Sequence, residues 1–116
     1  MKKRLLVMNG QKLFQNDSTG EWKTEKVSKA QGINPGIYNL YNAVDADKTK
    51  ENIGEIIYVD KKENVLYQKH ESRYIKHDLN CFDQIPETGC IFNIKYENNK
   101  TNITNISQKL SQTIKI

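Results

Sequence analysis

The sequence has few of the residues that small proteins use for covalent or metal-based stabilisation. Of its 116 residues, only two are cysteines, Cys81 and Cys90, and only two are histidines, His70 and His77. Two separated cysteines cannot build a disulfide framework, and structural zinc needs four closely spaced ligands. The sequence therefore predicts a domain without disulfides, metal or cofactor. Such a domain depends on its apolar core for stability.

Long apolar runs are also missing. No stretch approaches the roughly 18 apolar residues that cross a bilayer. The short run Leu5–Met8 behind the basic start ends at Asn9-Gly10, which is too early for a signal peptide. We therefore expect a cytoplasmic protein that stays out of the membrane. A chain of this length predicts a single domain, over residues 1–100, with residues 101–116 as a tail, a strand end or a short helix.

No arrangement of catalytic residues is visible either. The six glycines are isolated, so no glycine-rich phosphate loop opens a helix. His77 and Asp78 are neighbours that would point to opposite faces of a strand, so His77 is expected to end a strand and Asp78 to begin a turn. Cys90 alternates with Phe92 and Ile94 and is expected in the core. We predict that the protein is not an enzyme and works by binding.

What the chain does contain is a series of short apolar runs separated by turn residues. Alternation of apolar and polar residues predicts strands at 53–59, 65–69 and 90–96, and a third strand of a meander at 73–76. Asn9-Gly10 favours a tight hairpin turn, although a kink in one long strand also fits. The pattern is typical of an all-β protein, and we expect a small SH3-like barrel or β-roll.

Three segments bear on helical structure. Leu79, Phe82 and Ile85 have the spacing of one 3₁₀ or α turn, which Pro86 would end. From Ile103 onward, apolar residues recur at helical spacing, so the chain could close with a C-terminal helix or with a frayed tail. Residues 21–29 fit a short strand and a single helical turn equally well.

The positive charge is concentrated in one stretch of the chain. Residues 61–76 carry five cations against two acids, whereas 45–60 and 77–98 are both net negative. The five cations are Lys61, Lys62, Lys69, Arg73 and Lys76. Three tyrosines lie near them in sequence, namely Tyr58, Tyr67 and Tyr74, and small barrels hold single-stranded nucleic acid on basic, aromatic sheets. We predict nucleic-acid binding through these cations, directed at the backbone and weakly sequence-specific because lysine predominates.

Two other interpretations of the surface stay open. A solvated lysine-rich face explains the same cations without any ligand. A protein-docking interface could instead be built on Trp22, Tyr38 and Tyr41.

The segment from Pro35 to Tyr96 resembles the KfrB domain, a small module of conjugative plasmids and of multi-domain proteins of other mobile elements. The resemblance, with a core over about 35–96, rests on Pro35, Gly36, Ile37, Tyr38, Ala43, Ala46, Asp47, Gly54, Ile57, Val59, Val65, Tyr67, Gln68, Ile75, His77, Asp78, Gly89, Ile94 and Tyr96. The stretches 6–11 and 21–23 resemble the region ahead of that domain. The resemblance implies a part in plasmid maintenance or conjugative transfer and supplies no catalytic residues.

Together these observations predict a non-enzymatic accessory protein of a plasmid or other mobile element that binds nucleic acid. The alternative is a protein-binding module that docks on a plasmid maintenance or transfer protein, or that inhibits a host defence protein.

Overall fold

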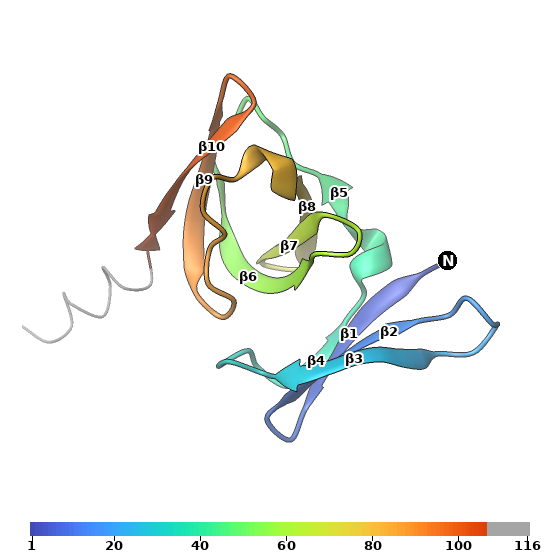
Figure 1. Cartoon of the computed structure of the whole chain (residues 1–116). Coiled ribbons are helices and arrows are strands. Elements are labelled where there is room, and N and C mark those ends of the chain that lie inside the picture. Colours follow the sequence, from blue (N-terminus) through green and yellow to red (C-terminus); the bar gives the residue numbers. More distant parts are fainter. Residues whose placement is uncertain (107–116) are drawn as a thin grey trace, which may run out of the picture. The chain divides into compact units, whose positions relative to one another are not determined.

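In a computed structural model, the chain folds mostly into β-strands, as the sequence predicts, and the structure describes residues 1–106 (Figure 1). The packing sorts the chain into two compact units, the first covering Met1–Ala43 and the second beginning at Val44. The sequence predicts one domain over residues 1–100 and does not mark this boundary. No helix in the described part of the chain has the length and apolar character to span a membrane.

The first unit is a four-stranded antiparallel sheet. Its strands are β1 (Lys3–Met8), β2 (Gln11–Asn16), β3 (Lys23–Lys29) and β4 (Gly36–Tyr38), in the order β3-β2-β1-β4. Asn9 and Gly10 join β1 to β2 with φ angles of 52° and 74°, which are the positive values that a tight hairpin turn needs. The hairpin prediction is therefore confirmed. Residues 21–29, whose structure the sequence left open, contain the edge strand β3.

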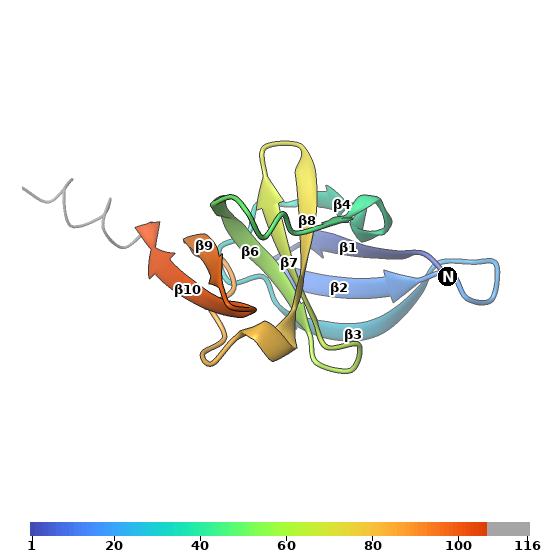
Figure 2. The same ribbon diagram turned by 90° about the horizontal axis from the view of Figure 1, so that it is seen from above.

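The second unit is a six-stranded sheet. Its strands are β5 (Val44–Asp45), β6 (Asn52–Asp60), β7 (Val65–His70), β8 (Arg73–Asp78), β9 (Ile91–Glu97) and β10 (Lys100–Asn105), in the order β10-β9-β6-β7-β8-β5. The antiparallel meander β6-β7-β8 is confirmed, and β5 joins β8 in parallel. Figure 2 shows the β9-β10 hairpin at one edge of this sheet, where Asn98 and Asn99 turn the chain with positive φ.

The core of the second unit lies on the side that the curved sheet encloses (Figure 1). Its buried members are Ile56, Leu66, Leu79, Phe92 and Ile94. Cys90 packs against this cluster, as the alternation in the sequence predicts. Apolar residues of the predicted strands β6, β7 and β9 therefore supply this core.

The SH3-like barrel that the sequence predicts is not what the chain forms. Within the described residues, β10 and β5 are the two edges of the six-stranded sheet, and no ladder joins them. A barrel closes only when its first and last strands pair. Here the N-terminal strands instead form a separate sheet, so their hydrogen bonds are not available to close the larger one.

The predicted helices also need correction. In place of a helical turn over 79–85, three residues, Leu79–Cys81, form a 3₁₀ turn. Asp78 caps this turn by accepting a hydrogen bond from the Asn80 amide, and that contact ends β8. The predicted C-terminal helix is not supported where the chain is described, because residues 100–105 pair with β9 as strand β10. The rest of that predicted helix lies outside the described residues.

Candidate functional site

The five cations predicted as a nucleic-acid site lie along the β6-β7-β8 meander, but the structure does not bring them together. Lys61 and Lys62 are exposed in the β6-β7 turn, whereas Lys69 and Arg73 lie at the opposite end of β7 and β8. A six-residue strand is about 20 Å long, which sets the separation of the two pairs. Strand alternation further divides them, because Lys69 and Lys76 point to one face of the meander and Arg73 to the other.

Acidic neighbours accompany two of these lysines. The Nζ of Lys76 is 3.9 Å from a carboxylate oxygen of Asp45, and Glu63 and Asp78 line the same hollow. Lys69 is opposite Glu55 in the β6-β7 ladder. Carboxylates at these positions repel a phosphate backbone, so within this group Lys61 and Lys62 are the cations best placed for an anionic ligand.

The tyrosines near these cations do not form an open stacking platform. Tyr58 and Tyr67 are only 6% and 7% exposed, so their rings are unavailable to nucleic-acid bases. Burial also raises the pKa of the Tyr67 hydroxyl. The alternating tyrosines of this meander therefore belong mainly to the interior.

A chain of three polar side chains, two of them buried and one partly buried, crosses the core of the second unit. The Nε2 of His77 is 2.8 Å from Oε1 of Gln68, and the Nδ1 of His77 is 2.6 Å from the hydroxyl of Tyr96. The Nε2 of Gln68 donates to the backbone carbonyls of Asn52, Gly54 and Phe92 at 3.0 to 3.2 Å. β7, β8 and β9 each supply one of the three side chains, so the network links strands across the curved sheet.

The hydrogen bonds of Gln68 fix the tautomer of His77. Because the Gln68 nitrogen points to three carbonyls, its Oε1 must face His77 and accept a hydrogen bond from Nε2–H. The Nδ1 of His77 is then unprotonated and accepts the hydrogen bond of the Tyr96 hydroxyl. Burial lowers the pKa of His77 to about 4 and raises that of Tyr96. His77 is consequently a neutral imidazole at pH 7.

The chemistry of this network is that of a structural element. His77 contacts an amide and a phenol, whereas a general base is normally oriented by a carboxylate or a comparable group. Asp78 points elsewhere and accepts a hydrogen bond from the Asn80 amide. The strand ends at Asp78, one residue later than predicted, and Asp78 caps the turn that follows. Among the described residues, no group of three or more His, Cys, Asp or Glu side chains could hold a metal ion.

Of the three aromatic residues considered for docking, two come together on the first unit. The rings of Trp22 and Tyr41 stack with centroids 6.3 Å apart. The guanidinium of Arg4 lies 4.2 Å from the centre of the Trp22 ring. Tyr38 is instead buried, and its hydroxyl donates a hydrogen bond to the carbonyl of Asn34. Trp22, Tyr41 and Arg4 are all residue types that concentrate at protein interfaces.

The first unit also exposes an aliphatic row that crosses its whole sheet. Val27, Leu13, Leu6 and Ile37 come one from each strand and are direct neighbours in the ladder register. Val27 is 52% exposed and Ile37 56%, and Leu6 and Leu13 are partly exposed. Met8, 43% exposed, lies beside the row on the same face. Four strands spaced about 4.8 Å apart make the row about 14 Å long.

We call the side of the sheet that carries this row the open face. Its strand residues are Arg4, Leu6, Met8, Gln11, Leu13, Gln15, Thr24, Val27, Lys29 and Ile37. None of these residues of the described strands β1 to β4 is acidic. The Arg4 Nε donates to Gln15 Oε1 at 2.8 Å while its guanidinium covers Trp22, so the Trp22–Tyr41 pair borders one end of the open face.

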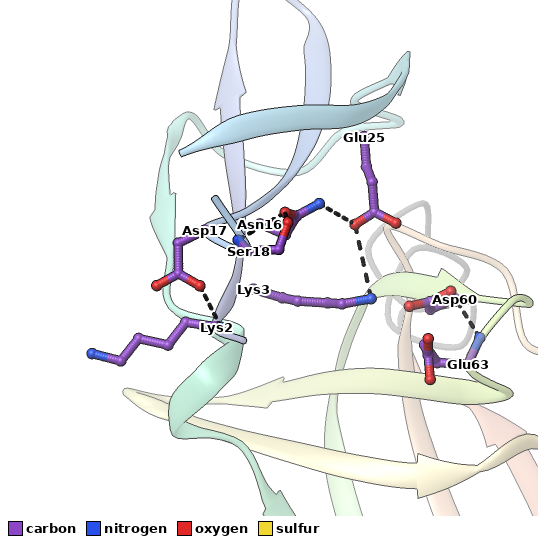
Figure 3. Close-up of polar contacts among 8 residues, drawn as sticks. All are labelled: Lys2, Lys3, Asn16, Asp17, Ser18, Glu25, Asp60 and Glu63. Carbon is purple, nitrogen blue, oxygen red and sulfur yellow. Dashed lines mark hydrogen bonds and ion pairs between the residues drawn. The ribbon is translucent and has the colours of Figure 1, made fainter. Parts of the chain in front are cut away.

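The acidic residue of β3 is directed away from the open face. Glu25 pairs with Lys3 at 3.8 Å and accepts a hydrogen bond from Asn16 at 3.0 Å, and both partners belong to the opposite face (Figure 3). Asp17 accepts a hydrogen bond from the Lys2 backbone amide, in the same view. Residues 1–43 carry seven cations against three acids. The open face is therefore an aliphatic row in a positively charged surround.

Comparison with known proteins finds a family match within the second unit. Residues 51–105, which span β6 to β10, match the model of the KfrB domain. This segment of the chain is similar to the KfrB domain. The resemblance predicted from the sequence is thus confirmed for that segment. The chain is also similar to Protein TraB of Escherichia coli, with 31% identity over 96 residues. That alignment covers 80% of this chain and 64% of TraB, so the chain spans less than two thirds of its relative's length.

The buried network explains several residues that carry the KfrB resemblance. Gly54, Gln68, His77 and Tyr96 are all part of it or contact it. A Cβ at Gly54 would collide with the backbone carbonyl of Lys69. Sequence reasoning missed the network, although one signal was available: Gln68 alternates with Leu66 on the buried face of a strand.

Proposed function

We propose that this protein is a non-enzymatic accessory protein of a plasmid or other mobile element, and that it acts by docking on an acidic protein partner through the open face. The KfrB domain supports the mobile-element setting, since the resemblance implies plasmid maintenance or conjugative transfer. The observation that carries the docking function is the exposed aliphatic row Val27–Leu13–Leu6–Ile37.

The energetics of this row favour a ligand. Exposed aliphatic side chains scattered singly need no explanation, but a continuous row with a polar surround is typical of an interaction surface. Covering apolar surface contributes about 25 cal/mol for each Å² that is removed from water. Trp22, Tyr41 and Arg4 at one end of the row supply the aromatic and guanidinium contacts on which interfaces often depend.

The charge around the row defines the partner. Arg4 and Lys29 share the open face with the row, and the acid of β3, Glu25, is held by Lys3 on the other side. A partner with an apolar centre and an acidic rim complements this arrangement. A second copy of the chain would instead bring cations against cations. Nucleic acid fits poorly because aliphatic side chains offer no ring on which bases stack.

Nucleic-acid binding is a second candidate function, which Lys61 and Lys62 support. Both are exposed at the tip of the β6-β7 turn, where each could contact a phosphate. The two candidates differ in their dependence on salt and in the unit that carries the contact, so they can be separated experimentally.

The test is cross-linking of the full chain in a host that carries a conjugative plasmid, followed by identification of the trapped proteins. The double variant Val27→Thr/Ile37→Thr keeps β-branched residues in both strands but removes the aliphatic ends of the row. We expect the affinity of this variant for a specific acidic partner to fall at least about tenfold. Burying the two aliphatic side chains contributes more than the 1.4 kcal/mol that corresponds to a factor of ten.

Ile85→Thr is the matched control, since Ile85 is also an exposed aliphatic residue, at 46%, but belongs to a loop of the second unit. It should retain the partner. Equal trapping by the wild type and the double variant would refute docking through the open face. Recovery of DNA in place of protein, with loss on raising the salt concentration, would favour the second candidate.

A further inference from the structure

The second unit contains a pocket of about 250 Å³ beside the β7-β8 turn. The loop before β6, the start of β6, the end of β7 and the start of β8 line it. Its lining residues are Asp47, Lys50, Glu51, Asn52, Ile53, His70, Arg73 and Ile75. The volume lies below the range of about 300 to 1,000 Å³ that is usual for drug-sized ligands, so the pocket suits a small molecule or a single chemical group.

His70 and Arg73 form a pair of hydrogen-bond donors on one wall. They are directly opposite each other in the β7-β8 ladder, on either side of the two-residue turn. Opposed residues of an antiparallel pair share a face, with their Cβ atoms about 5 Å apart. Within residues 1–106, neither side chain makes a hydrogen bond or ion pair. The guanidinium fork of Arg73 is suited to bidentate binding of a carboxylate or a phosphate.

The acidic residues of the pocket are already compensated. Asp47 accepts hydrogen bonds from the Thr49 amide at 2.9 Å and the Thr49 hydroxyl at 2.6 Å, and it lies 4.0 Å from Lys50. Glu51 pairs with Lys95 at 2.9 Å. These contacts lower the pKa of both carboxyl groups, so both are ionised and have partners. The guanidinium of Arg73 is therefore the charge in the pocket that an anionic ligand would neutralise.

The remaining lining residues select the kind of anion. Ile75 provides an apolar surface on the face of β8 that also carries Arg73. Asn52 is rigidly held, since its Nδ2 donates to the carbonyls of Asp47, Lys50 and Ile94. The two ionised carboxylates among the lining residues disfavour a doubly charged phosphate more than a singly charged group.

We propose that the second unit binds a small carboxylate with a short aliphatic body in this pocket, with Arg73 and His70 holding the carboxylate and Ile75 contacting the body. The carboxylate could belong to a free carboxylic acid or to the end of a peptide, since the recognised chemistry is the same. This site is independent of the open face and does not rest on the proposed docking function.

The test is a titration of the full ¹⁵N-labelled chain with sodium butyrate at constant ionic strength, followed by backbone amide shifts in NMR spectra. We expect saturable shifts at residues 52–54 and 70–75. Arg73→Gln should weaken binding at least about tenfold, because a hydrogen bond to a charged group contributes more than 1.4 kcal/mol. Arg73→Lys should recover part of the affinity. Lys62→Gln, which removes an exposed cation at the other end of the meander, is the matched control and should bind like the wild type.

Further ligands separate the possible sources and can overturn the proposal. Butylammonium, which has the same body and the opposite charge, should not shift these amides. A peptide that ends in valine should compete with butyrate if the site also takes a peptide terminus, whereas failure to compete assigns it to free acids. Inorganic phosphate that binds as well as butyrate would refute the carboxylate assignment. Unchanged butyrate shifts in Arg73→Gln, or no saturable shift in the wild type, would refute the site.

Discussion

His77 donates its Nε2–H to the Oε1 of Gln68 across 2.8 Å, and the nitrogen of that amide is held by three backbone carbonyls. The direction of this hydrogen bond is therefore fixed by the backbone of β6 and β9, not by the histidine. A proton added to His77 would go to Nδ1, where the hydroxyl of Tyr96 donates. Protonation must break or reverse that contact inside the core.

The first prediction is that the protein loses stability as the pH falls from 6.5 toward 4. The pKa of His77 is about 4 in the folded protein and about 6.5 in an unfolded chain, so the unfolded state binds the proton first. The contribution of His77 is complete above pH 6.5 and is lost as the pH falls toward 4. We expect the free energy of unfolding, from urea denaturation, to drop by about 2 kcal/mol between pH 7 and pH 5.

NMR titration of the His77 imidazole gives an independent check. Its ring signals should stay those of the neutral Nε2–H tautomer down to about pH 5. Titration of His77 near pH 6.5, or a free energy of unfolding that is constant between pH 7 and 5, would contradict the buried neutral histidine.

The second prediction ranks two members of the buried network. Gln68→Ala removes the donor to three buried carbonyls and the acceptor for His77, whereas Tyr96→Phe removes a single hydroxyl. Unsatisfied buried groups cost about 1 to 3 kcal/mol each, so Gln68→Ala should lower the free energy of unfolding by at least about 3 kcal/mol and Tyr96→Phe by about 1 to 2. Gln11→Ala, at an exposed position, is the control and should cost less than about 0.5. Equal losses in Gln68→Ala and Tyr96→Phe would show that Gln68 does not organise the network.

The third prediction concerns the close approach of β6 and β7. A Cβ at Gly54 would collide with the backbone carbonyl of Lys69, which belongs to the neighbouring strand and cannot rotate away. Gly54→Ala should therefore destabilise the protein by about 2 kcal/mol or more, although alanine normally favours an ordered backbone over glycine. Thermal denaturation measures the effect. A melting temperature equal to or above that of the wild type would mean that the two strands are further apart than described.

The elements of the fold were predictable where local sequence determines them. Asn9-Gly10 and the alternation over 53–59 and 65–69 define two hairpins, because turn chemistry and strand period act over a few residues. The division into two open sheets was not predictable in this way. Which strand pairs with which depends on contacts between distant segments, and β1 and β4 pair across more than 25 residues.

The candidate sites show the same limit. Lys61 to Lys76 are continuous in the sequence, yet a strand of six residues carries them to opposite ends of the meander. Conversely, Leu6, Leu13, Val27 and Ile37 are far apart in sequence, and only the ladder register makes them one row. Closeness in sequence therefore predicted a cationic patch that the fold divides, and it gave no sign of the aliphatic row.

The last prediction tests nucleic-acid binding, the second candidate function, at the two exposed lysines of the β6-β7 turn. Of the five cations predicted as a site, Lys61 and Lys62 are the two that are exposed side by side, so their binding to random-sequence DNA should involve about two phosphates. The logarithm of the binding constant should then fall with the logarithm of salt concentration with a slope no steeper than about −2, from roughly −0.9 for each phosphate. Fluorescence anisotropy with a labelled duplex measures this slope.

Charge reversal at the turn separates the two lysines from the other cations. Lys61→Glu/Lys62→Glu should abolish the DNA binding, whereas Lys69→Gln/Arg73→Gln should leave it unchanged. Glutamine is the better substitution at Lys69, because a glutamate there would face Glu55 across the ladder and destabilise the sheet on its own account. A slope near −4, or loss of binding in Lys69→Gln/Arg73→Gln, would mean that all five cations act together, as the sequence alone suggests. DNA binding that survives the charge reversal would show that the turn lysines are only a solvated surface.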